Sequence, residues 1–244
     1  MTATLPAGPG LPRLESAGLD GWMVRLFDTI DEANLPWLAA LTERCEQVLG
    51  DALVDLVPSY TTMLVVFDPL RKAPSEVREL LAAELQVLAP KGPADTRDIV
   101  ELLTFYHSSV GPDLDRVAEH TGLTVEQVIE CHSAGVYRVF AIGFAPGFAF
   151  MGLTAPELEC PRMDTPRPKV PVGSVALAGR QTAAYPLATP GGWNLLGRTC
   201  ARLFDRNRDG FSLLRVGDRV RFTPVSGSLF QQLGGDLTPM EPKP

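Results

Sequence analysis

The chain has 244 residues, enough for one large domain or two ordinary ones, and its 45% hydrophobic and 21% charged residues are typical of a soluble globular protein. A formal net charge of −7 argues against nonspecific binding to nucleic acid or to anionic membranes. No apolar run approaches the roughly 18–20 residues that a membrane span needs, and Met1–Pro12 lacks the features of a secretory signal. The scattered cysteines form no CxxC pair, so we expect reduced thiols, a cytoplasmic protein and no metal site.

The first 105 residues alternate between strand-like and helix-like segments. Residues 1–17 are rich in Pro, Gly and Ala and are expected to form a flexible tail. Helical spacing of apolar residues predicts helices that begin near Asn34 and Ser75. Apolar runs predict strands over residues 22–27, 52–57, 61–67 and 99–105. The order βαββαβ is the ferredoxin-like arrangement, so we expect a ferredoxin-like α/β domain over residues 18–105.

The remainder, residues 106–235, is predicted to hold a helical pair followed by a β-rich domain. The helices are expected over Asp113–His120 and Thr124–His132. Their outline resembles a helix-turn-helix, but the second helix has no Lys or Arg to contact DNA, so we interpret them as a packed pair. His132 falls on the apolar face of its helix, which favours a structural role. Short β-type runs between Gly- and Pro-rich turns then indicate a barrel or sandwich, with a tail over residues 236–244. The predicted fold class is therefore α+β.

A loop rich in glycine and phenylalanine runs from Gly143 to Gly152. Its glycines permit close backbone approach, and Phe144 and Phe148 can supply apolar walls. Two interpretations stay open. The loop either presents backbone N–H groups to an anion or polarised carbonyl, or forms a tight turn stapled by aromatic rings.

A proline-stiffened strip follows over residues 165–174. It holds Arg167 and Lys169, which lose little backbone entropy on engaging an anion. Two such cations in a protein of net charge −7 are consistent with a carboxylate or phosphate site, although a solvated surface strip would have the same composition.

The third segment covers residues 179–199. Arg180 and Arg198 can each bind an oxyanion through two N–H groups. Neutral or apolar groups suited to an amide or lactam lie between them: Gln181, Thr182, Tyr185 and Trp193. A Trp after a Gly-Gly turn can equally serve as a core plug.

In their order and spacing, these segments resemble the small subunit of bacterial 5-oxoprolinases, a family also called allophanate hydrolase subunit 1 or KipI-like, with a carboxyltransferase domain of subdomains C and D. The matching strings are GFAPGFAFMG, TPRPKVPVGS and GRQT…YP…TPGGW…GRT. Pro58–Tyr60, Gly111–Leu114 and His132 also fit the family pattern. The resemblance extends over roughly residues 18–230.

The resemblance implies that the barrel is cyclophilin-like. It also implies that the chain works with a larger homologous barrel subunit, the C subunit or allophanate hydrolase subunit 2 type, and with a separate A subunit. Together such subunits open the lactam of 5-oxoproline to glutamate at the expense of ATP, and the isolated chain is expected to be inactive. The sequence has no P-loop, so Mg-ATP is expected at a site shared with, or located on, the partners.

On this reading the catalytic candidates are Arg180, Gln181 and Arg198. The substrate-binding candidates are Gly143, Phe144, Gly147, Phe148, Lys169, Thr182, Tyr185 and Trp193.

Two alternatives come from other classes of protein. KipI-like relatives inhibit a sensor histidine kinase, and Phe144 and Phe148 would then be interface anchors. Convergence of Arg180, Gln181 and Arg198 in one pocket would favour the enzyme over this regulator. The second alternative is a carboxyltransferase-like subunit related to urea carboxylase, which would act on a biotin carrier in trans because this chain has no biotinylation motif.

Overall fold

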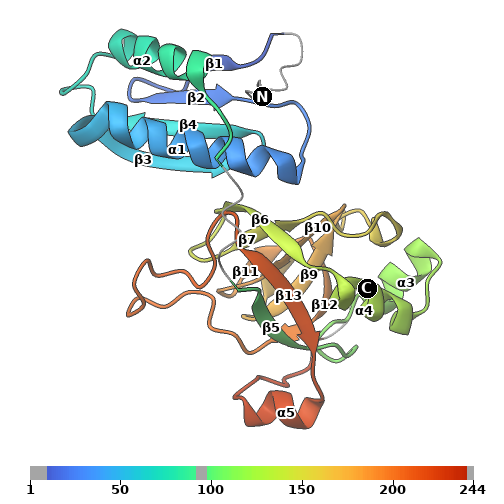
Figure 1. Cartoon of the computed structure of the whole chain (residues 1–244). Helices are drawn as coiled ribbons and strands as arrows, with labels where there is room; N and C mark the ends of the chain where they lie inside the picture. Colours follow the sequence, from blue (N-terminus) through green and yellow to red (C-terminus); the bar gives the residue numbers. More distant parts are fainter. Residues whose placement is uncertain (1–9, 92–97, 241–244) are drawn as a thin grey trace. The chain divides into compact units, whose positions relative to one another are not determined.

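A computed structural model describes residues 10–91 and 98–240, and the chain divides into two compact units, residues 1–96 and 97–244 (Figure 1). The first unit is an antiparallel sheet in the order β1-β2-β4-β3 with helices on one face. Its elements are β1 (Arg13–Ser16), β2 (Gly21–Arg25), the short helix η1 (Glu32–Asn34), α1 (Leu35–Leu49), the short helix η2 (Gly50–Ala52), β3 (Leu53–Ser59), β4 (Thr62–Phe67) and α2 (Pro74–Val87).

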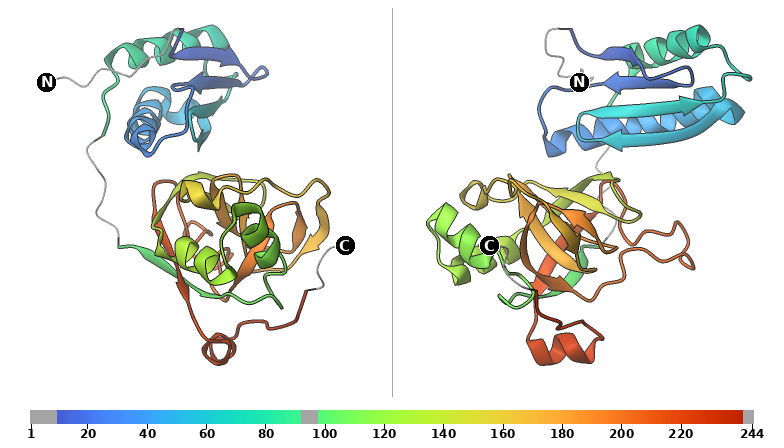
Figure 2. Two further views of the ribbon diagram at one scale, coloured as in Figure 1. Left: turned by 90° about the vertical axis from the view of Figure 1, so that its right-hand side faces the viewer. Right: turned by 180° about the vertical axis from the view of Figure 1, so that it is seen from behind.

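Both long helices cover the same face of this sheet (Figure 2). Helix α1 begins with Pro36 in its first turn, a position where the missing N–H costs nothing, and α2 begins with Pro74 in the same way. Their apolar stripes pack against alternate residues of β2 and β4 to form one core. Its fully buried members include Leu38, Leu41, Val77, Leu81, Val24 and Val65.

The predicted βαββα part of this unit is confirmed, but the fourth strand is not the one expected. The edge beside β2 is filled by β1, which precedes it in a segment predicted to be a flexible tail. The strand predicted over residues 99–105 belongs to the second unit, and the boundary predicted at residue 105 is wrong for the same reason. A strand's own sequence sets its alternation and not its partner, so local signals could not assign it.

The second unit is a closed barrel in the order β10-β7-β6-β13-β5-β12-β9. The barrel strands are β5 (Val100–Phe105), β6 (Tyr137–Ile142), β7 (Ala149–Gly152), β9 (Ser174–Ala178), β10 (Gln181–Ala184), β12 (Asn194–Thr199) and β13 (Arg219–Pro224). A two-stranded ribbon of β8 (Arg167–Val170) and β11 (Thr189–Gly191) accompanies it. The predicted barrel is therefore confirmed, with β5 paired in parallel to β13.

The helices of this unit are α3 (Leu114–Thr121), α4 (Val125–Ala134), α5 (Gly227–Gln232) and the short helix η3 (Pro156–Leu158). The predicted packed pair is confirmed as α3 and α4, which share an apolar cluster with Leu177 and Leu196 of the barrel. Helix α4 starts with a capping box between Thr124 and Gln127. Helix α5 lies apart from this pair (Figure 2).

The end of the chain departs from the predicted tail. The carbonyls of Asp236 and Thr238 accept hydrogen bonds from Arg198, and the N–H of Met240 donates to the carbonyl of Ser109 at 2.7 Å. Residues 236–240 thus pack on the barrel, while 241–244 of the predicted tail lie outside the described residues. Within the described ranges, no helix is both long enough and apolar enough to cross a membrane.

Candidate functional site

The candidate residues are spread over β8, β10, β12 and the loops next to the barrel strands, and β9 lies between β10 and β12. Strand alternation divides these strands between two apolar clusters. Val175 and Ala184 join residues from around the barrel, such as Leu102 and Phe222, and so point inward. Their neighbours Ala176, Ala183 and Leu195 belong to a separate outer cluster with Phe148, Tyr185 and Trp193.

Phe148 is the centre of that outer cluster. Its ring makes edge-on contacts with Phe144 at 5.2 Å, Tyr185 at 5.2 Å and Trp193 at 5.9 Å between centroids. Phe148 is buried and Trp193 half-buried, whereas Phe144 is 65% exposed with a left-handed φ of 68°. An exposed aromatic ring held in a strained backbone conformation suits contact with another molecule.

The Gly143–Gly152 loop uses its own backbone donors internally. The N–H of Gly143 donates to the carbonyl of Phe148, that of Ala145 to Gly143, and that of Phe148 to Ala145. Gly147 adopts a positive φ of 80° where it passes close to Phe204. This geometry is that of a turn stapled by aromatic rings. It does not support the expectation that Gly143 and Phe148 offer their N–H groups to an anion.

Tyr185 is buried against the β8–β11 ribbon rather than open to a ligand. Its hydroxyl hydrogen-bonds the backbone of Trp193 and lies against Gly191, and burial raises the pKa of Tyr185 to about 12. Tyr185 is therefore a neutral structural phenol, and its expected contact with substrate is not supported by this placement.

Arg198 is the most unusual of the predicted residues. Its side chain is 1% exposed, and Nη1 donates to the carbonyls of Asp236 at 2.6 Å and Thr238 at 3.1 Å. The carboxylate of Asp236 lies 3.3 Å from Nη1. Nε and Nη2 are buried and have no hydrogen-bond partner among the described residues. Burial lowers the pKa of Arg198, against the opposing effect of Asp236.

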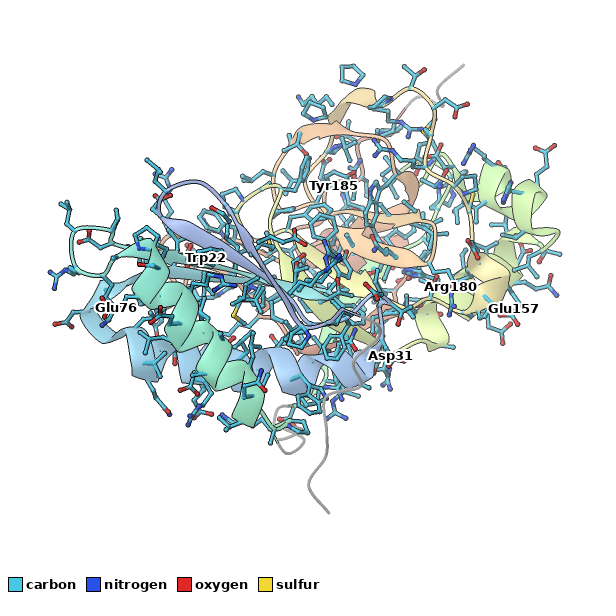
Figure 3. All side chains as sticks on the ribbon, turned by 90° about the horizontal axis from the view of Figure 1, so that it is seen from above. Trp22, Asp31, Glu76, Glu157, Arg180 and Tyr185 are labelled. Carbon is cyan, nitrogen blue, oxygen red and sulfur yellow. The ribbon has the colours of Figure 1, made fainter. Side chains whose placement is uncertain are left out.

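Arg180 and Gln181 lie at the other end of β9. Arg198 pairs with Ser174, the first residue of that strand, whereas Gln181 pairs with Ala178, the last. Nε and Nη2 of Arg180 both donate to the carbonyl of Thr154, at 3.1 and 2.9 Å. Arg180 lies near η3, which carries the labelled Glu157, and away from Tyr185 (Figure 3). The structure therefore does not bring the three predicted catalytic residues together.

The two cations of the 165–174 strip face different surroundings. Arg167 is buried and forms an ion pair of 2.7 Å with Asp113, both side chains being 5% exposed. The other carboxylate oxygen of Asp113 accepts from the N–H of Leu195 at 2.7 Å. Through Asp113, Arg167 therefore links β8 to the start of α3 and to β12. Lys169, two residues after Arg167 on β8, is exposed.

Thr182 is buried, and its hydroxyl bonds other groups of the barrel unit. Its hydroxyl donates to the carbonyl of Ala176 at 3.0 Å and also lies 2.8 Å from Nε2 of His132. A hydroxyl has one hydrogen, so Nε2 of His132 must carry the proton, and Nδ1 then accepts from the hydroxyl of Tyr106 at 2.7 Å. His132 is fully buried and its pKa is lowered by burial to about 3. The predicted structural role of His132 is confirmed, and the Thr182 hydroxyl is part of the same buried network.

Sequence reasoning missed Ser174 and Asp236. Ser174 was not among the predicted site residues, yet it lies directly opposite Arg198 and its buried hydroxyl has no partner among the described residues. Asp236 lay in the presumed tail. Within the part of the chain that the structure describes, no group of three or more His, Cys, Asp or Glu is placed to hold a metal.

Comparison with known proteins identifies the family. The model of the carboxyltransferase domain, subdomain C and D, matches residues 12–214. The chain belongs to this family. The 5-oxoprolinase B subunit of Bacillus subtilis (strain 168) is 34% identical over 228 residues, which cover 88% of this chain and 93% of that one.

Solved structures share this fold. A crystal structure of a protein named TTHA0988 is 38% identical with a TM-score of 0.74, and the match covers 85% of this chain but only 40% of that chain. Urea carboxylase of Kluyveromyces lactis, at 18% identity and a TM-score of 0.74, shares the fold over 94% of this chain and 23% of its own. The chain therefore spans less than half of either of these solved chains.

Proposed function

We propose that this chain is the B subunit of an ATP-dependent 5-oxoprolinase that opens the lactam of 5-oxo-L-proline to L-glutamate. The observation that carries the proposal is the match along 93% of the Bacillus subtilis relative, which is named as a 5-oxoprolinase B subunit. Such a name implies that other subunits exist. The proposed partners are the larger homologous barrel subunit and the separate A subunit, and the isolated chain is expected to be inactive.

Arg198 is the residue of this chain best suited to hold the substrate. The substrate 5-oxoproline carries a carboxylate beside its lactam, and a guanidinium binds a carboxylate through two parallel hydrogen bonds. Arg198 has a pair of donors, Nε and Nη2, still available for that contact. Its role would be to bind and orient the substrate, which converts binding energy into correct placement of the lactam for the chemistry.

ATP fits this chain poorly. The sequence has no glycine-rich phosphate loop, and the glycine-rich loop at 143–152 uses the N–H groups of Gly143, Ala145 and Phe148 for its own turn. We therefore propose that Mg-ATP binds on a partner or at a site that a partner completes, and we derive no step through it. Free thiols at Cys45, Cys131, Cys160 and Cys200 support the proposed cytoplasmic setting.

Reconstitution tests this proposal. The chain would be copurified with its two partner subunits, and glutamate release from 5-oxoproline would be measured with ATP, without ATP, and with each subunit left out in turn. We expect turnover only when all three subunits and ATP are present. An assembled complex that releases no glutamate would contradict the proposal.

The exposed ring of Phe144, and the separation of Arg180 and Gln181 from Arg198, favour a second candidate, a KipI-like inhibitor of a sensor histidine kinase. Its 65% exposure and its place beside the buried Phe148 suit an interface anchor. Kinase autophosphorylation measured with increasing amounts of this chain distinguishes the two. Inhibition by the isolated chain, abolished by Phe144→Ser, would support the regulator.

A further inference from the structure

Arg198 is a buried cation whose guanidinium has hydrogen-bond partners on one side only among the described residues. Nη1 is held by the carbonyls of Asp236 and Thr238. Nε and Nη2 are sealed from solvent and unpartnered among the residues that the structure describes. Unsatisfied buried donors on a charged group are costly, and native proteins rarely keep them without a ligand, ion or water to fill the place.

The unpartnered atoms lie on one edge of the guanidinium. The N–H of Nε and one N–H of Nη2 point in the same direction, which is the geometry that receives two oxygens of one carboxylate or phosphate. Arg180 shows this edge in use within the same chain, because its Nε and Nη2 both donate to the carbonyl of Thr154. The corresponding edge of Arg198 lacks such an acceptor.

Ser174 adds a further hydrogen-bonding group on the same face of the sheet as Arg198. It faces Arg198 in the antiparallel pairing of β12 with β9, and residues directly opposite in such a pair project their side chains from the same face. The Ser174 side chain is fully buried and its Oγ has no partner among the described residues. Two side chains that face each other across β12 and β9 thus each keep buried donors without a partner among the described residues.

We propose that Arg198 and Ser174 form a binding site for an oxyanion with two available oxygens, a carboxylate or a phosphate group, and that residues 236–240 are a strap that closes it. The inference rests on the proposed function only in naming the carboxylate of 5-oxoproline as the natural ligand. In the closed form, the carboxylate of Asp236, 3.3 Å from Nη1, supplies the negative charge that a ligand would bring.

The strap is attached by few contacts, which makes its displacement feasible. Besides the two carbonyls that meet Arg198, the N–H of Met240 donates to Ser109, and the Met240 side chain packs against the outer aromatic cluster around Phe148. The Asp236 side chain is 63% exposed, so solvent weakens its attraction to Arg198. In this proposal, displacement of the strap opens the buried Nε and Nη2 to a ligand.

Calorimetric titration of the isolated chain tests the site. The probes are 5-oxo-L-proline, inorganic phosphate and 2-pyrrolidinone, which has the lactam but no carboxylate. Three proteins are compared: the full chain, a chain ending at Gly235, and that shortened chain with Arg198→Lys, which keeps the charge and loses the two-donor edge. We expect at least one anion to bind the shortened chain about tenfold or more tightly than the full chain. This gain in affinity should vanish in the shortened chain with Arg198→Lys. Pyrrolidinone should bind the full and shortened chains equally.

The two anionic probes distinguish the source of the ligand. Preference for 5-oxoproline assigns the site to the substrate carboxylate, and preference for phosphate assigns it to a phosphoryl group. Equal affinities of the full and shortened chains, or a gain that survives Arg198→Lys, would overturn the proposal.

A second variant keeps the test valid if the shortened chain fails to fold. Met240→Ala in the full chain removes the apolar anchor of the strap and leaves all the residues at Arg198 in place. We expect severalfold tighter anion binding, and an unchanged affinity would overturn the strap. Because binding is measured without partner subunits, loss of the proposed enzymatic function leaves this result standing. A complex that turns over while no protein binds an oxyanion would refute the site alone.

Discussion

Arg198 lies directly opposite Ser174 where β12 pairs with β9, and both side chains are buried with donors that lack partners among the described residues. Inside the barrel, the buried His132 has a hydrogen-bond partner at each ring nitrogen, Tyr106 at Nδ1 and Thr182 at Nε2. The hydroxyls of Thr154, Thr189 and Thr223 also lack partners among the described residues, but Arg198 is the charged side chain of this set, and an unpartnered buried charge costs more than an unpartnered hydroxyl.

The buried His132 should make the barrel sensitive to acid. Its pKa is about 3 in the folded barrel against 6.5 for an unperturbed histidine, so the stability linked to its neutral form is complete above pH 6.5 and is lost as pH falls toward 3. Between pH 6.5 and 5 this group alone should lower the free energy of unfolding by about 2 kcal/mol. Urea unfolding of the barrel at several pH values measures the effect.

The test variant is His132→Gln, which should reduce the slope of the unfolding free energy against pH in this range, even though it lowers stability at pH 7. The control is a histidine away from the core. The same replacement of His120, exposed on α3, measures the general effect of removing a histidine. If His132→Gln and the wild-type chain lose stability in parallel as the pH falls, the assigned protonation is wrong.

The buried pair of Arg167 and Asp113 should be structural. Asp113→Ala leaves the guanidinium of Arg167 buried without its carboxylate, which typically costs about 3–5 kcal/mol. Replacing both residues, Asp113→Leu with Arg167→Met, should recover much of that loss. Glu101→Ala breaks the half-exposed pair with Arg221 in the same barrel and should cost about 0–1 kcal/mol. Equal costs for the two single variants in urea unfolding would rule out the assigned role of Arg167.

Phe144 should matter for assembly more than for stability. Phe144→Gly relieves a left-handed φ of 68° while removing an exposed ring, so the free energy of unfolding should change by less than about 1 kcal/mol. Affinity for the partner that binds this ring, the proposed larger barrel subunit or, for the alternative function, a sensor kinase, should fall about tenfold or more, as measured by titration. Phe211→Gly is the matched control, because Phe211 is also exposed, at 56%, with a φ of 61°. Equal losses in the two variants would count against a specific interface at Phe144.

Local patterns predicted individual elements well and their partners poorly. The helical spacing of Leu38, Leu41 and Cys45 predicted α1, and the apolar face that includes Val128 predicted the burial of His132. The strand at Val100–Phe105 was also expected, but it pairs in parallel with β13, over a hundred residues later. Such a long-range choice leaves no local trace, so the sequence placed this strand in the wrong unit.

The site depended on the same distinction. Arg180 and Arg198 are each flanked by glycine and looked equivalent in the sequence. Arg180 lies in the turn between β9 and β10. Arg198 lies on β12 opposite Ser174, the first residue of β9, where Asp236 near the chain end contacts it. Neighbouring residues Gln181 and Thr182 likewise point to opposite faces of β10, because successive side chains alternate in a strand. Composition indicated that this segment could bind an oxyanion, whereas strand register separates Arg180, bonded to Thr154, from Arg198, whose Nε and Nη2 lack partners among the described residues.

The most direct test of the proposed role of Arg198 is glutamate release from 5-oxoproline by the assembled three-subunit complex carrying Arg198→Lys or Arg180→Lys. Losing a charge-assisted bidentate contact should lower kcat/KM about 10- to 100-fold for Arg198→Lys, with a higher KM. Arg180→Lys, whose parent side chain bonds a backbone carbonyl, should stay within about threefold of wild type. A complex with Arg198→Lys that assembles and turns over like wild type would contradict the account.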